Sequence, residues 1–148
     1  TDMMTPAYGQ SELVKKLCAE FQTTDTCAVH VRGGDIIGPG RAFFERALAR
    51  MEKERPGLRY LVFTNDREAA KEALEGEHTE RKMTYISELG AFSDIDEFFL
   101  MAACRHQIIS NSSYSTWAAY LNPNPEKVVI MPEYKGCEQI RLKEWIVL

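Results

Sequence analysis

The sequence predicts an α/β fold in which a Rossmann-like parallel sheet of about five strands carries helices on both faces. Short apolar runs rich in β-branched residues alternate with longer segments of helical period, and this alternation is typical of parallel sheets. Most of the short runs are apolar throughout, as strands covered on both faces should be. The 148 residues are 45% hydrophobic, and no repeat or Gly/Ser-rich linker divides them. We therefore expect one domain with a continuous core.

Five segments fit strands, at 27–31, 59–63, 83–86, 107–110 and 127–131. The intervening helices show apolar residues three and four positions apart. In the first two helices these residues are Leu13, Leu17 and Phe21, and then Phe44, Ala47, Leu48 and Met51, with Pro56-Gly57 ending the second helix. A third helix is expected from after Asn65-Asp66 to Gly76.

The last two helices have clear start signals. Ser93 or Asp94 would cap a fourth helix, whose predicted stripe is Ile95, Phe98, Phe99 and Ala102. A fifth helix should begin within 112–115 and end at Asn122-Pro123. The aromatic residues at helical spacing, Phe98, Phe99, Trp117 and Tyr120, are interpreted as core.

The composition excludes several classes of partner. Acidic residues outnumber Lys and Arg by 22 to 18, which argues against a nucleic-acid-binding surface. No run of 18 apolar residues predicts a membrane span, and no signal-peptide pattern is present. The four cysteines lack CxxC spacing, so we interpret them as buried free thiols. His78 fits a solvated charged connection, and His106 with Arg105 fits a helix C-terminus. Small-molecule partners are expected.

The first candidate site follows the strand at 27–31. His30 and Arg32 alternate at its end and should point to the same side of the sheet, followed by Gly33, Gly34 and Asp35. An arginine there can fork onto a pyrophosphate, while glycines let the backbone come close to the same anion. The alternative is that Arg32 pairs with Asp35 across a glycine turn.

A second candidate site lies where the strand at 107–110 meets the next helix. The segment from Ser110 to Ser115 puts hydroxyl groups at a helix N-terminus, where unpaired N–H groups favour phosphate. The alternative is simple capping by one serine. A third junction, Thr64-Asn65-Asp66, could offer a carboxylate to a base or ribose, but such residues more often only start a helix.

The motifs HVRGGD at 30–35, YLVFTND at 60–66 and EFFLMAACRHQIISNSSYSTWAAYLNPNPEKVVIMP at 97–132 resemble the α-1,2-fucosyltransferase family in order and spacing. The resemblance extends to the closing Trp145-Ile146. It implies that residues 1–148 form the sugar-nucleotide-binding half of a two-domain, GT-B-like enzyme, without the N-terminal acceptor domain. Such an enzyme uses GDP-fucose as donor and, with inversion and without a metal or other cofactor, passes fucose to the 2-hydroxyl of a galactose-containing glycan.

The resemblance also assigns residues. It places His30, Arg32 and Asp35 at the catalytic end, with Arg32 and Gly34 at the diphosphate, while Gly33 stands where the family has a second arginine. The nucleotide-contacting role falls on Ser112, Ser113, Tyr114 and Ser115. An acid near the guanine is either Glu97 or Asp96. No general base is identified, although Asp35 is the nearest carboxylate.

The residues also allow two alternative functions. One is a non-catalytic nucleotide- or glycan-binding module that lost the second arginine and the acceptor domain. Another is a phosphatase-like or receiver-like domain, which would need an acid directly after the first strand. The formal glycosylation sequon at 111–113 lies where a ligand is expected, which favours a bacterial cytoplasmic setting over a membrane-associated or Golgi-lumen one. An exposed apolar patch would mark a missing domain or self-association.

Overall fold

A computed structural model describes residues 12–32, 40–74, 83–133, 142 and 144–148. Five α-helices are described: α1 (Glu12–Thr23), α2 (Arg41–Glu54), α3 (Arg67–Leu74), α4 (Asp94–Ala103) and α5 (Ser113–Leu121). The strands are β1 (Thr26–Val31), β2 (Arg59–Thr64), β3 (Met83–Tyr85), β4 (His106–Ile108), β5 (Val129–Met131) and β6 (Ile146–Val147). A short 3-10 helix, Ile86–Glu88, follows β3.

The strands form one parallel sheet in the order β3-β2-β1-β4-β5-β6. The order reverses between β1 and β4, as in doubly wound folds. The predicted fold class is thus confirmed, and all five predicted strands are present. A sixth, β6, extends the sheet beside β5. Two residues are too short to show periodicity, so sequence patterning missed this strand.

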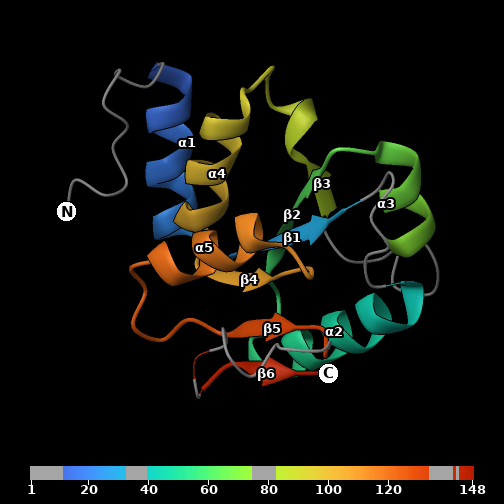
Figure 1. Ribbon diagram of the computed structural model, residues 1–148. Helices are drawn as coiled ribbons and strands as arrows, with labels where there is room; N and C mark the ends of the chain where they lie inside the picture. Colours follow the sequence, from blue (N-terminus) through green and yellow to red (C-terminus); the bar gives the residue numbers. More distant parts are fainter. Residues whose placement is uncertain (1–11, 33–39, 75–82, 134–141, 143) are drawn as a thin grey trace.

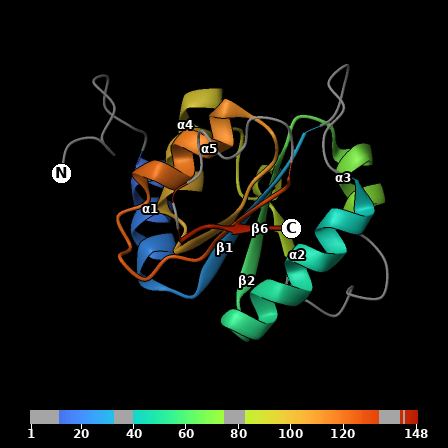
Figure 2. The ribbon, with the colours of Figure 1, turned by 60° about the horizontal axis from the view of Figure 1, so that its bottom comes forward.

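Helices cover both faces of the sheet, as expected (Figures 1 and 2). α2 and α3 lie on one face, while α1, α4 and α5 lie on the other. The β1 side chains alternate between the two cores: Cys27 and Val29 face the first layer, and Ala28 faces the second. The whole of β1 is therefore buried, which explains its continuous apolar run.

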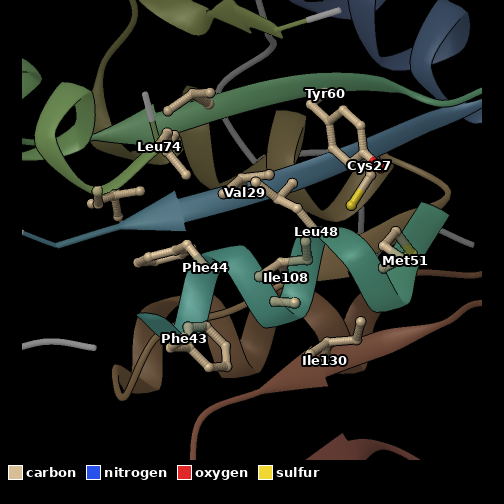
Figure 3. Packing of buried hydrophobic residues seen from close by; sticks show 14 of the residues in the cluster. Cys27, Val29, Phe43, Phe44, Leu48, Met51, Tyr60, Leu74, Ile108 and Ile130 are labelled. Atoms are coloured by element: carbon tan, nitrogen blue, oxygen red, sulfur yellow. The ribbon is translucent and has the colours of Figure 1, made fainter. Parts of the chain in front are cut away.

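The core beneath α2 follows the predicted stripe closely. Phe44, Leu48 and Met51 are fully buried and pack on β1, β2 and the strands beyond them (Figure 3). Burying a side chain of this size stabilises a fold by about 1.5–3 kcal/mol. Gly57, whose φ of 82° suits glycine, lies in the turn that follows α2. The second helix and its end are thus confirmed.

Three apolar residues that the stripes placed inside are exposed. The exposed fractions are 44% for Leu13, 55% for Ile95 and 59% for Trp117. In α1 the buried row begins at Val14, one position later than predicted, and in α4 the fully buried residues lie at 100–103. In α5, Trp117 makes an edge contact with the ring of Tyr120 and stays exposed to solvent. Leu17, Phe21 and Ala102 are buried as predicted, so the stripes of α1 and α4 were wrong only at some of their positions.

The histidine at the end of α4 is not a helix C-terminal residue, as the sequence had indicated. α4 ends at Ala103, and His106 begins β4, where it is buried. Its Nδ1 accepts the backbone N–H of Val128 at 2.9 Å. Burial, together with neighbouring Arg55 and Arg105, lowers the pKa of His106 from its usual 6.5 to about 4. His78 lies outside the described residues.

The predicted helix starts and thiols are largely confirmed. Ser93 caps α4, accepting the amide of Asp96, and Asn122 ends α5. Cys27 and Cys104 are buried free thiols and Cys18 is half-buried, whereas Cys137 lies outside the described residues. Over those residues, no helix has the length and apolar character that crossing a membrane requires.

Candidate nucleotide-binding site

The functional side chains predicted from the sequence come together at the point where the strand order reverses. β1 and β4 are neighbours in the sheet although about 80 residues separate their ends, as the contact between His30 and Ser110 shows. In open parallel sheets, ligands bind beyond the carboxyl ends of the strands at such a reversal. The ends of β1 and β4, with the starts of α4 and α5, are therefore where a ligand is expected.

A cleft of about 390 Å³ opens at this position. Its lining comes from four parts of the chain: His30 and Arg32 from the end of β1, 63–65 from the end of β2, Asp94 and Glu97 from α4, and Ser112 and Tyr114 from α5. A larger cavity of about 550 Å³ lies at the opposite end of the sheet, around Arg105 and 122–126. There Arg105 already bonds the backbone of Gln22, so the smaller cleft is the better candidate.

A hydrogen bond joins Arg32, which follows β1, to Ser112, which lies between β4 and α5. Arg32 Nη1 donates to Ser112 Oγ at 3.2 Å, and the same oxygen accepts the amide of Tyr114 at 3.2 Å as the cap of α5. A hydroxyl that accepts two hydrogen bonds keeps its proton for a third partner. Ser112 can therefore donate to a ligand while it caps the helix, so capping and ligand binding are compatible roles for this serine.

His30 is a neutral side chain in the wall of the cleft. It is 9% exposed, and its Nδ1 lies 2.8 Å from Ser110 Oγ. Burial, and secondarily the charge of Arg32, lowers the pKa of His30 from 6.5 to about 4. At neutral pH the positive charge among the described lining residues is therefore that of Arg32.

The part of the lining that comes from α4 is acidic. Burial raises the pKa of the Glu97 carboxyl, and the neighbouring Asp94 carboxylate raises it further. Tyr114 contacts both parts of the lining: its hydroxyl donates to the backbone carbonyl of Asp94 at 2.7 Å, and its ring lies 5.7 Å from that of His30. Burial raises the pKa of Tyr114, so this hydroxyl stays protonated.

The structure separates the predicted site residues into three groups. Those that line the cleft are His30, Arg32, Glu97, Ser112 and Tyr114. Those that do not line it are Asp96, Ser113 and Ser115. Gly33, Gly34 and Asp35 lie outside the described residues, so the proposed pairing of Arg32 with Asp35 stays a prediction.

The residues that miss the cleft have other roles. The Asp96 carboxylate accepts the amide of Ser93 at 3.4 Å, as half of a capping box, which leaves Glu97 as the acid facing the cleft. Ser115 is buried behind the cleft, where its Oγ accepts the amide of Ser110. Ser113 is exposed on the outer side of α5.

Two parts of the lining, at the end of β2 and at the start of α4, were not among the predicted site residues. Thr64 and Asn65 line the cleft, whereas Asp66, the carboxylate of that junction, accepts the amide of Ala69 and starts α3. Asp94 also lines the cleft, three residues before Glu97 on the same helix. That i, i+3 spacing was the available signal, because such residues share a helix face.

The lining suits a ligand that carries both an anionic group and a donor-rich group. Arg32 and the N-terminus of α5 favour negative charge, while Asp94 and Glu97 favour hydrogen-bond donors. Within the described part of the chain, no three His, Cys, Asp or Glu side chains gather as potential metal ligands. That the protein works without a metal stays a prediction.

Fold and cleft together define a Rossmann-like domain with a candidate nucleotide site at its strand-order reversal. The family model for glycosyl transferase family 11 matches residues 12–148, so the chain belongs to that family. This confirms the resemblance seen in the motifs.

A curated relative, the O-antigen biosynthesis glycosyltransferase WbnK of Escherichia coli, is 28% identical over 151 residues. The match covers 88% of this chain and 48% of the relative, so the chain spans about half of that protein's length. No solved structure matches the chain.

Proposed function

We propose that this glycosyltransferase domain binds GDP-fucose, the donor from which fucose passes to a galactose 2-hydroxyl of a glycan. The main support is the meeting of Arg32, from the first half of the sheet, with Ser112 at the N-terminus of α5, 3.2 Å apart in one cleft. An arginine beside a helix N-terminus is a strong site for a diphosphate. The fucose donor itself is inferred from the family motifs.

Arg32 would stabilise the leaving group of the transfer. When the bond between sugar and diphosphate breaks, negative charge builds on the diphosphate oxygen that departs with GDP. A guanidinium fixed by Ser112 is already oriented toward that charge, so little reorganisation is needed during the reaction. The hydroxyl proton of Ser112 and the first-turn amides of α5 would add further donors.

Glu97 would recognise the base. Guanine presents adjacent N–H donors on one edge, and a carboxylate accepts two such donors at once. Glu97 lines the same cleft as Arg32 but comes from a different element, α4, and it is partly withdrawn from water, which strengthens its hydrogen bonds. Asp94 contributes negative charge beside it.

Transfer to an acceptor, with inversion and without a metal, belongs to the same proposal. Because the chain matches 48% of its E. coli relative, we expect acceptor contacts from polypeptide other than residues 1–148. Gly33, which replaces the family's second arginine, favours a second candidate: a domain that binds the nucleotide without catalysing transfer.

Calorimetric titration of the chain with GDP, GDP-fucose, GDP-mannose and UDP tests the proposal. We expect the guanine nucleotides to bind and UDP to bind more weakly, since uracil offers Glu97 a single N–H donor in place of guanine's adjacent pair. Binding of none of the four would refute the nucleotide site. A separate assay with GDP-fucose and lactose distinguishes a catalytic domain from the binding module: efficient transfer by this chain alone would contradict the expected need for further polypeptide.

A further inference from the structure

Ser110 lies behind the cleft, where His30 meets the second half of the sheet. It is completely buried just after β4 and does not line the cleft, although the sequence placed it at the start of the second candidate site. Its Oγ lies 2.8 Å from Nδ1 of His30. The direction of this hydrogen bond decides which ring nitrogen carries the proton, because a hydroxyl can donate or accept and a neutral imidazole has one donor and one acceptor.

The position of the hydroxyl proton follows from the acceptors around Ser110. Among the described residues, its Oγ has two acceptors within reach: Nδ1 of His30 at 2.8 Å, and Oγ of Ser115 at 3.5 Å. Good O–H hydrogen bonds span about 2.5–3.0 Å, and the Ser115 oxygen already accepts the Ser110 amide. Directing the proton to Ser115 would leave a buried donor almost unsatisfied, which is costly. The Ser110 hydroxyl therefore donates to His30.

We infer that Ser110 is a positioning residue: it holds Nδ1 of His30 as an acceptor, so the neutral ring carries its proton on Nε2 and donates it to the ligand. Among the described residues, Nε2 makes no hydrogen bond, and the ring lines the cleft beside Arg32. The partner would be an acceptor atom of the nucleotide, either a phosphate oxygen or a base carbonyl. The ligand part of this inference rests on the proposed function.

His106 supplies an internal standard for the proton position. Its Nδ1 accepts the backbone N–H of Val128 at 2.9 Å, and a backbone amide can only donate. The proton of a neutral His106 must therefore be on Nε2. A nitrogen-detected NMR spectrum of the unliganded wild-type protein should show the same ring pattern for His30 as for His106. A proton on Nδ1 of His30 would overturn the inference, and this measurement needs neither a variant nor a ligand.

Ser110→Ala tests the consequence for binding. Losing the bond that orients His30 should weaken GDP binding about three- to tenfold, and Ser110→Thr, which keeps a hydroxyl, should recover much of it. The matched control is Thr26→Val, which removes a buried hydroxyl at the other end of β1, where Thr26 bonds the Phe21 carbonyl. The control should lower the melting temperature without changing GDP affinity. Unchanged affinity in folded Ser110→Ala would overturn the positioning role.

Titrations with pyrophosphate and with guanosine show which part of the nucleotide accepts the His30 hydrogen bond. If pyrophosphate shows the loss in Ser110→Ala, His30 contacts a phosphate; if guanosine shows it and pyrophosphate does not, His30 contacts the base. If wild type fails to bind GDP, the proposed function fails and takes the ligand part of this inference with it, while the NMR measurement still decides whether Ser110 sets the proton on His30.

Discussion

Replacing Arg32 by alanine should weaken GDP binding by about tenfold to a hundredfold while the domain stays folded. A guanidinium has five N–H donors, and among the described residues Arg32 uses one of its nitrogens, Nη1, on Ser112. No other described residue accepts a hydrogen bond from Arg32, so the proposal assigns its remaining donors to two diphosphate oxygens. A hydrogen bond to a charged group contributes about 1.5–3 kcal/mol, and each 1.4 kcal/mol is about a factor of ten in affinity.

Arg32→Lys should give an intermediate dissociation constant, because an ammonium group keeps the charge but cannot make two parallel bonds. The matched control is Arg59→Ala. Arg59 also carries one positive charge, but it pairs with Glu20 at 3.3 Å at the start of β2, far from the carboxyl end of the sheet. This control removes the same net charge and should leave GDP affinity nearly unchanged.

Calorimetric dissociation constants and melting temperatures of these proteins distinguish a ligand role from a structural one. If Arg32 serves only to pair with Asp35 or to hold Ser112, its replacement should lower the melting temperature and leave GDP affinity intact. Unchanged GDP affinity in a folded Arg32→Ala protein would therefore remove Arg32 from the site and refute the reasoning behind the proposed diphosphate contact.

Three other outcomes are expected. Glu97→Gln should weaken GDP binding about tenfold with little effect on pyrophosphate, whereas Asp96→Asn should affect only the melting temperature; equal effects on GDP would contradict this assignment. Folding lowers the pKa values of both described histidines from 6.5 to about 4, so between pH 6.5 and about pH 4 the unfolded chain binds more protons than the folded one. Denaturant titrations should show stability falling as pH drops through that window, by about 3 kcal/mol for His30. Trp117→Ala should cost under about 0.5 kcal/mol against about 3–5 kcal/mol for Phe44→Ala, and a large loss at Trp117 would show that α5 packs differently.

Alternation of strands and helices was sufficient to predict the fold, because each long element carries its own periodic signal. The fully buried β1 and the stripe of α2 are the clearest cases. The prediction of elements and buried faces failed where a strand was very short, or where a helix carried apolar residues on several sides. β6 has two residues, and α5 has apolar side chains on several sides, so its sequence alone could not show that Trp117 faces outward.

The sequence predicted those residues of the candidate site that directly follow a strand. His30 and Arg32 follow one strand, Ser112 and Tyr114 follow another, and parallel strands bring their carboxyl ends to one edge. The choice between Asp96 and Glu97 needed the geometry of α4, since helix direction decides which acid caps and which faces the cleft. The contact between Ser110 and His30 joins two strands and has no local sequence signal.

The reversal of strand order has a consequence for how this site comes into being during folding. Two hydrogen bonds of the described site, from Arg32 to Ser112 and between His30 and Ser110, each join residues 80 positions apart. Neither the β3-β2-β1 half nor the β4-β5-β6 half holds both members of either pair. A partly folded chain with one half formed would have helices and buried strands but no complete pocket. The cleft is thus a property of the joined sheet, and ligand recognition can arise only after the most distant segments of the chain have found each other.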